Sequence, residues 1–338
     1  TWLRRQRQMC IRDRLWANKL RTILSLLGVT VGIFSIITIL TAVDSLKKDI
    51  QDDLSKLGDD LVMVVKWPII MDANYPWWKY VNRPQPSHDD YEYLKEKSHT
   101  VGGITFQVQV PNAVIAKGGK KISGADIAAG THDYNQVINM DIGYGRYFSP
   151  SESEFGANVA IVGADIAEAL FDNVENAVGN LVLIDNIRVQ IIGTVKKEGA
   201  SILGMDFNNS VLLPYEMVHK NMHLDPEQSS PQVFLNPVEG VSVDDMIAEC
   251  TGLMRSVRKL RPKQDDNFSL SEFSMITNTF NNMLNVLSMA GWIIGGLALL
   301  VGGFGIANIM YVSVKERTNI IGIKKALGAQ KSYILYEF

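Results

Sequence analysis

Two long stretches without a charged residue constrain this chain more than any other feature of its sequence. Residues 22–43 are 22 consecutive uncharged residues, and residues 273–314 are 42. About 20 apolar residues are enough for a helix to cross a lipid bilayer. Four asparagines make the start of the second stretch polar, so we expect its helix to begin in water and enter lipid near Leu284. We therefore predict transmembrane helices at 22–43 and 284–314.

Positive charge gathers at the outer flanks of the two stretches. Residues 1–21 carry seven Lys or Arg and one acid, residues 315–338 carry five and two, and residues 22–314 carry a net charge of −12. Short basic flanks remain on the cytoplasmic side of a membrane. We therefore expect a cytoplasmic segment at 1–21, cytoplasmic termini, and an extracytoplasmic domain at 58–272. The total net charge of −3 leaves no basic excess for binding nucleic acid.

The extracytoplasmic region is predicted to be an α+β domain. Short apolar runs bounded by turn residues predict strands at 61–66, 104–110, 113–116, 157–162, 181–184, 187–195 and 211–213. Helices are expected at 89–97, 164–171 and 243–260. Asp185 and Asn186 tolerate the positive φ of a two-residue hairpin turn between two of these strands. The basic run that ends the last helix, from Arg255 to Lys263, is interpreted as a solvated helical face.

Two segments next to the uncharged stretches carry an apolar stripe at helical spacing. Its members are Leu46, Ile50, Leu54 and Leu57 in the first segment, and Ile276, Phe280, Met283 and Leu287 in the second. This spacing places apolar side chains on one face of a helix. We predict stalk helices at 44–57 and 273–283 that pack together as a rigid lever. The alternative is that each segment packs only on its own domain.

Small residues and tryptophans suggest two further contact surfaces. Small residues four apart let membrane helices approach closely, and such pairs predict helix packing at Gly28, Gly32, Gly291, Gly295 and Gly303. Trp67, Trp77 and Trp78 cluster with two prolines in one expected loop, where aromatics can bind a substrate or partner. A loop that packs on its own domain, or rests at the membrane surface, explains the same three residues.

No catalytic pattern is found in the sequence. A Gly-x4-Gly-Lys-Ser/Thr phosphate loop is absent, so no ATP site is expected in this chain. His219 and His223 share a helical face, but Lys220 stands where a zinc protease needs glutamate. No Gly-x-Ser-x-Gly nucleophile elbow occurs either. We expect a chain that is not an enzyme and that holds no cofactor or metal of its own.

Three segments at the membrane ends together resemble the MacB/FtsX-type permease subunits of ABC transporters. The first is Asn-Lys-Leu-Arg at 18–21 followed by Gly28 and Gly32, and the second is the apolar run at 295–311. The third reads Glu-Arg-Thr at 316–318, Ile-Gly-Ile at 321–323, two lysines, and Ala-Leu-Gly-Ala at 326–329. The family commonly has an acid just before Ile-Gly, where this sequence has Ile320. The large outer domain is similar to that of MacB-like members.

The resemblance implies a multi-pass protein of the bacterial inner membrane. In relatives the outer domain combines a Porter-like βαβ lobe with an inserted, mostly β lobe, which is expected here at about 121–230. Relatives have four membrane spans, so residues 333–338 are expected to begin a third span, before which the chain looks truncated. Residues 1–14 fit the family poorly and suggest an incorrect start or a junction sequence.

The resemblance also implies a homo- or heterodimer of permease subunits, served by a separate cytoplasmic ABC ATPase that binds ATP and Mg²⁺. Membrane lipid is a further partner, and a periplasmic adaptor or outer-membrane channel is left open. A coupling segment at 315–332 is expected to dock on the ATPase through Glu316, Arg317, Thr318, Ile321, Gly322, Ile323, Lys324, Lys325, Leu327 and Gly328. Ile321, Ile323 and Leu327 would fill a groove, and the two lysines would face acids at its rim.

The function that this resemblance implies is mechanotransmission. ATP-driven motion would pass to the outer domain for efflux or extracytoplasmic handling of a peptide, lipoprotein or drug. Two other classes share the topology. For a transmembrane sensor we would expect a heptad-rich helical relay after the second span. An FtsX-like regulator of cell-wall hydrolases usually has a smaller outer domain.

Overall fold

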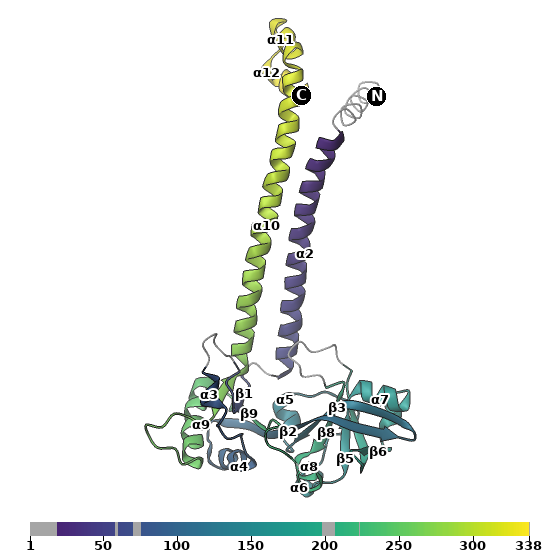
Figure 1. Cartoon of the computed structure of the whole chain (residues 1–338), viewed down its shortest axis with the longest axis vertical. Helices are drawn as coiled ribbons and strands as arrows, with labels where there is room; N and C mark the ends of the chain where they lie inside the picture. The colour runs from purple at the N-terminus through teal and green to yellow at the C-terminus, as the bar shows by residue number, and fades with distance from the viewer. Residues whose placement is uncertain (1–18, 58–59, 70–75, 198–206, 223, 338) are drawn as a thin grey trace. The chain divides into compact units, whose positions relative to one another are not determined.

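The computed structural model describes residues 19–57, 60–69, 76–197, 207–222 and 224–337 (Figure 1). The chain divides into two compact units, one made of residues 1–47 and 281–338 and the other of residues 48–280. The segment 1–14, expected to be non-native, lies outside the described residues.

The greater part of two long helices lies in the first unit. Helix α2 (Lys19–Leu57, 39 residues) and helix α10 (Phe273–Glu316, 44 residues) each run without a break through a predicted stalk and a predicted span. Neither contains proline, which would remove a backbone donor and kink the helix. Most of their described apolar side chains are exposed, which is typical of lipid-facing helices and not of core helices. Both are long and apolar enough to cross a membrane.

Two short helices complete the first unit. Helix α11 (Thr318–Ala326) follows α10 after one residue, and helix α12 (Lys331–Glu337) follows α11 after a short turn. The predicted coupling segment is therefore helical over most of its length. The third span that we expect to begin at 333 stays a prediction, because α12 ends with the described residues.

The described part of the second unit folds around a ten-stranded mixed sheet. Its strands are β1 (Val62–Val65), β2 (Val101–Lys117), β3 (Lys120–Gly130), β4 (Ile142–Gly145), β5 (Val159–Val162), β6 (Leu181–Ile184), β7 (Ile187–Val195), β8 (Ser210–Pro214), β9 (Gln232–Pro237) and β10 (Ser269–Glu272). Their order is β10-β1-β9-β2-β3-β8-β5-β7-β4, and β6 pairs with β2 and β7. The β3–β8 and β5–β7 pairs are parallel, and the other pairs are antiparallel.

Short helices surround this sheet. They are α3 (Trp77–Tyr80), α4 (His88–Lys97), α5 (Tyr134–Ile138), α6 (Pro150–Phe155), α7 (Ala164–Phe171), η1 (Glu175–Ala177), α8 (Tyr215–Asn221) and α9 (Val243–Val257). Alternate residues of the central strands, such as Phe106 and Val108 on β2 and Val233 and Leu235 on β9, form one buried core with helices α4, α7 and α9. The predicted α+β class is confirmed.

The sequence predicts the strongest local patterns in this unit with the correct bounds. Helix α7 and strands β6 and β7 begin and end where expected, and Asp185 and Asn186 have the predicted positive φ angles of 45° and 69°. The two strands expected at 104–110 and 113–116 are one strand, β2, interrupted by an irregularity at Asn112 with a φ of 60°. The region predicted as an inserted lobe shares the sheet, because β3 pairs directly with β2.

The predicted stalk stripe on α10 agrees with the burial of Ile276 and Phe280, which are half-buried, and is wrong from Met283 onward. Met283 is 60% exposed and Leu287 is 44% exposed, whereas Leu284 is only 6% exposed. The buried positions continue at Gly291, Gly295 and Gly302, which lie seven, four and seven residues apart starting from Leu284. This is the 3.5-residue period of a helix pair, and small residues rather than large ones define it. The side chains of Leu54 and Leu57 lie outside the described residues.

Candidate functional site

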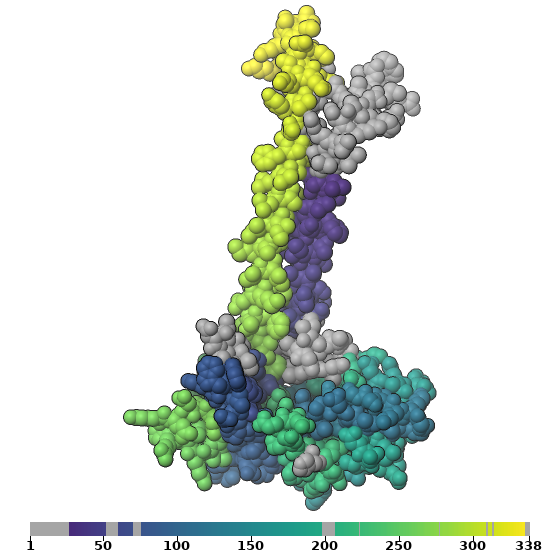
Figure 2. Space-filling view, in the orientation of Figure 1, coloured from purple at the N-terminus to yellow at the C-terminus, as the bar shows by residue number. Residues whose placement is uncertain are grey.

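Helices α2 and α10 lie side by side within the first unit (Figures 1 and 2), and they pack along a line of small residues. A methyl group built on Gly32 would lie 2.9 Å from Ala298 Cβ, and one built on Gly291 would lie 2.7 Å from Ile39 Cγ2. A methyl group on Gly295 would collide with Ile36. No larger residue fits at these three positions without separating the helices.

Gly302, and not the predicted Gly303, lies in the contact between α2 and α10. A methyl group on Gly303 would meet no described atom within 4 Å, whereas one on Gly302 would collide with Val29. Gly28 faces Gly302 at 3.9 Å, measured from a built methyl group to the Gly302 Cα. The contact positions on α10 repeat about every 3.5 residues, so the position two turns after Gly295 is Gly302 and not Gly303.

A tight elbow connects α10 to α11. Arg317 alone separates the two helices, and its N–H donates to the Val314 carbonyl at 3.1 Å. The Thr318 hydroxyl donates to the Lys315 carbonyl at 2.9 Å, so it binds one of the free carbonyls at the end of α10. Glu316 and Thr318 are exposed, and Arg317 is half-buried. The Glu-Arg-Thr motif therefore forms the elbow itself.

The Ala-Leu-Gly-Ala motif ends α11. Gly328 has a φ of +87°, and its N–H donates to the Lys325 carbonyl at 3.2 Å, while the Ala329 N–H donates to the Lys324 carbonyl at 3.1 Å. These two bonds form a Schellman motif, in which glycine at the left-handed position closes the helix. Gly328 is thus required by backbone conformation, and its position fixes the length of α11.

An exposed apolar stripe runs along α11. Ile320, Ile323 and Leu327 are 49%, 61% and 82% exposed, and their spacing of three and four residues places them on one helix face. Ile321 is half-buried and, at about 100° per residue, lies on another face. The exposed stripe therefore contains Ile320 and not Ile321, while docking of the expected trio Ile321, Ile323 and Leu327 stays a prediction.

The remaining predicted coupling residues surround this stripe. Lys325 is exposed and Lys324 is half-buried. A methyl group on Gly322 would meet no described atom within 4 Å, so the helix surface there is open. Open backbone beside an apolar stripe gives a partner room to approach closely.

At its other end α10 grows directly out of the sheet of the second unit. Strand β10 ends at Glu272 and α10 begins at Phe273, with no intervening residue. The Phe273 N–H donates to the Leu61 carbonyl at 2.9 Å, and β10 pairs with β1 from Val62↔Glu272 to Val65↔Ser269. Strand β1 is also the first strand after α2. The strand that follows α2 in the sequence and the strand that precedes α10 therefore pair with each other.

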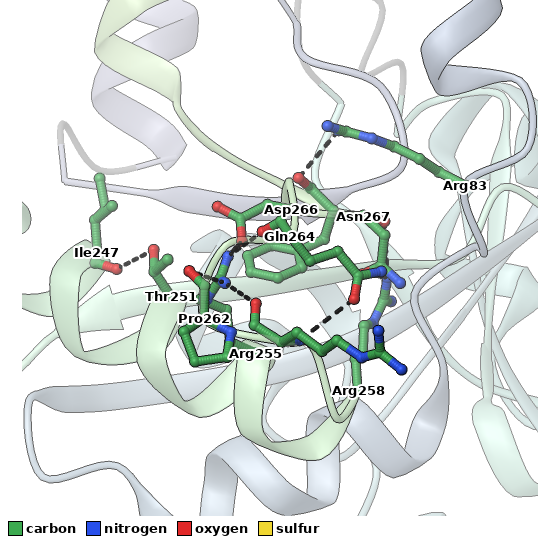
Figure 3. A network of polar contacts seen from close by, with 11 residues as sticks. Arg83, Ile247, Thr251, Arg255, Arg258, Pro262, Gln264, Asp266 and Asn267 are labelled. Carbon is green, nitrogen blue, oxygen red and sulfur yellow. Dashed lines mark hydrogen bonds and ion pairs between the residues drawn. The ribbon is translucent and has the colours of Figure 1, made fainter.

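A network of arginines holds the segment that precedes β10 (Figure 3). Arg258 binds Asp90 of α4 at 2.7 Å, with side chains only 8% and 6% exposed, and also donates to the Asn267 carbonyl at 3.0 Å. Arg255 pairs with Asp266 and donates to the Gln264 carbonyl at 3.1 Å. The expected solvated face is thus wrong for these two residues. Their side chains turn inward because they bind carbonyls that the loop 259–268 leaves without strand partners.

A second polar contact ties α9 to the start of β2. Glu249 accepts hydrogen bonds from the hydroxyls of Ser98 and Thr100 and from the N–H groups of His99 and Thr100. Burial alone raises the pKa of the Glu249 carboxyl, but the hydrogen bonds from Thr100, Ser98 and the two N–H groups outweigh it and hold the pKa at about 2. The Glu249 carboxylate is therefore ionised at neutral pH.

The three predicted tryptophans separate into two environments. Trp77 and Trp78 on α3 are 60% and 61% exposed. The Trp67 ring lies 6.2 Å from the Tyr80 ring, which in turn stacks under Arg83 at 4.2 Å. Arg83 donates to the Phe268 carbonyl at 3.0 Å, so α3 is attached to the segment that leads into β10. Of the three tryptophans, Trp77 and Trp78 present the larger exposed aromatic surface, and their rings contact each other, with centroids 6.1 Å apart.

Comparison with known proteins bears on this arrangement. The family described as "MacB-like periplasmic core domain" matches residues 22–253. The chain belongs to this family. Among curated proteins it is 30% identical to the macrolide export ATP-binding/permease protein MacB of Marinobacter nauticus, over 96% of this chain and 48% of that protein. It is 26% identical to the pyoverdine export ATP-binding/permease protein PvdT of Pseudomonas fluorescens, over 96% and 47%.

A solved structure agrees with the fold. The alignment with the periplasmic region of MacB from Actinobacillus actinomycetemcomitans covers 69% of this chain and 98% of that structure, with a TM-score of 0.54 and 15% sequence identity. The predicted MacB-like identity and the membrane-helix and α+β class are confirmed. The chain spans about half the length of the curated relatives it matches.

Sequence reasoning missed three parts of this site. The apolar role of Ile320 was visible in its spacing from Ile323 and Leu327. The phase of the seam could have been read from the 291, 295, 302 repeat. The Arg258–Asp90 pair joins residues 168 apart, and no local pattern indicates it.

Proposed function

We propose that this chain is the permease subunit of an ABC exporter and that it transmits motion from a cytoplasmic ATPase to an outer domain. The observation that carries the proposal is the continuity of α10. One proline-free helix joins the exposed stripe of α11, across a one-residue elbow, to strand β10 of the outer sheet. A displacement of α11 would pass to the sheet along this one continuous helix.

The partner is an ABC ATPase that supplies the ATP and Mg²⁺ chemistry, and this chain carries no ATP-binding motif. Ile320, Ile323 and Leu327 enter an apolar groove of the ATPase, and Lys325 faces acids beside it. Gly322 allows close approach of the two backbones. In the curated relatives, of which this chain spans 47%, one protein is named for both ATP binding and permease, which supports an ABC ATPase as the driver of this permease part.

The setting is the bacterial inner membrane, with both ends of this chain in the cytoplasm and the 48–280 unit outside. The basic flanks support this orientation. A second permease subunit completes the complex, and Gly303, which faces away from α2, is assigned to packing against another helix. The cargo class is a peptide, lipoprotein or drug. The described α11 is nine residues long, which does not favour the heptad relay of a sensor.

Co-purification with the ATPase tests this proposal. Leu327→Asp and Ile323→Asp each place a charge in the docking groove, and we expect at least a tenfold loss of ATPase retained on the tagged full-length chain. Phe155→Asp changes an exposed apolar residue of the outer unit and is the matched control, with no loss expected. Equal retention by all three variants would refute docking through α11.

A further inference from the structure

One region of the sheet in the outer unit is polar on the face opposite the core. On β2 the core takes Phe106 and Val108, so Gln107 and Gln109 lie on the other face. Gln107 is paired in register with Gln232 of β9, and Asp126 of β3 with Ser210 of β8. Four neighbouring strands thus bring carboxamide, carboxylate and hydroxyl groups to one patch.

A cavity of about 130 Å³ lies over this patch. It is lined by Gln107, Gln109, Asp126 and Gln232, and is bounded by the aromatic rings of Tyr134, Phe207 and Phe234. Tyr134 begins α5, and its ring packs so close to Gly130 that a methyl group there would lie 2.9 Å from it. The cavity holds about four water molecules at ~30 Å³ each, which is the space of one amino-acid residue.

Not every polar group of this cavity is unpaired: the Ser210 hydroxyl donates to the Phe207 carbonyl at 3.2 Å, but two other side chains make no side-chain hydrogen bond to the described residues. Gln107 is 4% exposed and Tyr134 is 3% exposed, yet within the described ranges no group bonds to the Gln107 carboxamide or the Tyr134 hydroxyl. Polar groups of side chains with so little exposed surface are normally paired with protein or ordered water. Burial raises the pKa of the Tyr134 hydroxyl, so it remains a neutral donor. Both groups face a space where a ligand can satisfy them.

We propose that this cavity binds an uncharged peptide group, namely one residue of extended peptide backbone. The carboxamides of Gln107 and Gln232 each offer a donor and an acceptor, which match the C=O and N–H of an amide. Asp126 accepts from a further N–H and disfavours anions, and the rings of Phe207 and Phe234 cover the apolar remainder. Because all these residues belong to the outer unit, the site does not depend on an ATPase and specifies which chemistry the outer unit holds.

Peptide backbone is favoured over a sugar by the planar, paired amides of two adjacent strands. A sugar hydroxyl can also donate to and accept from a carboxamide, so the planar shape of the amide, and not the number of bonds, sets this preference. A cavity that holds water alone is the other outcome of the test.

The experiment measures binding of N-acetylalanine N′-methylamide to the full-length chain in detergent micelles by saturation-transfer NMR, with no ATPase present. We expect saturable binding that weakens at least fivefold in Gln107→Leu/Gln232→Leu and at least twofold in Tyr134→Phe, which removes one hydroxyl and keeps the ring. Gln190→Leu alters an exposed glutamine of β7 outside the cavity and should bind like the unmodified chain. Methyl glucoside is the competing probe.

Three results would overturn the proposal. They are an absence of saturable binding, equal binding by the cavity variants, and stronger binding of methyl glucoside than of the amide. If the double variant fails to fold, Tyr134→Phe decides alone. Since ATPase docking is measured separately, loss of either result leaves the other standing.

Discussion

Removing the Arg258 side chain should loosen the attachment of α10 to the outer domain. In Arg258→Met the buried Asp90 carboxylate loses its 2.7 Å partner, and the Asn267 carbonyl loses a donor at 3.0 Å. Breaking a buried ion pair by removing one partner costs about 3–5 kcal/mol. Asp90 keeps the hydrogen bond from the Ser87 N–H at 2.9 Å that caps α4, so we expect a value of ~3 kcal/mol, near the lower end of that range.

The assay is hydrogen exchange followed by mass spectrometry on the full-length chain in micelles. A loss of ~3 kcal/mol corresponds to roughly 100-fold faster exchange through local opening. The acceleration should appear in peptides covering α9, the loop 259–268 and β10. In the double variant Arg258→Met/Asp90→Asn no unpaired charge remains, so most of the protection should return.

Arg261→Met is the matched control, because Arg261 belongs to the same basic run and is exposed. It should leave exchange unchanged. If hydrogen exchange in Arg258→Met is as slow as in Arg261→Met, the Arg258–Asp90 pair contributes nothing measurable, and the attachment of α10 through this pair is refuted.

Two further predictions concern the contact between α2 and α10 and the loss of stability at acidic pH. Gly295→Leu must displace Ile36 and separate α2 from α10, so we expect a lower melting temperature in micelles, whereas Gly303→Leu, which meets no described atom, should melt normally; equal melting would contradict the seam. The pKa of Glu249 at about 2 lies below its ordinary value of 4.5, so its contribution to stability is present above about pH 4.5 and is lost as pH falls toward 2. The free energy of unfolding, measured by urea titration at a series of falling pH values, should therefore decrease less steeply in Glu249→Gln than in the unmodified chain. Identical slopes of this free energy against pH would exclude the effect.

Local patterns predicted the parts of this fold that local physics determines. Uncharged length gave the two long helices, and the Asp185–Asn186 turn with its flanking strands set the β6–β7 hairpin. Strand β3 was missed because five of its eleven residues are Gly or Ala and only Ile122 and Ile127 are β-branched, and pairing with β2 and β8 stabilises it instead.

The coupling site stays a prediction, and the structure alters one detail of it, the exposed stripe of α11. Its chain segment was evident from the Glu-Arg-Thr and Ala-Leu-Gly-Ala motifs, but which isoleucine joins the exposed stripe depends on where α11 begins. A one-residue shift of the helix start changes the facing residue by about 100°. The Arg258–Asp90 pair and the amide cavity depend on strand order, which no single segment encodes.

The central claim is that ATP-driven movement of α11 reaches the outer domain through α10. The most direct test places a fluorophore at Trp77→Cys, in a chain whose native cysteines are replaced, and records its signal in proteoliposomes that contain the partner ATPase. ATP should change the signal of the labelled outer domain, and Leu327→Asp should abolish that change while leaving the label intact. An unchanged signal on ATP addition, or an ATP response that persists in Leu327→Asp, would contradict the account.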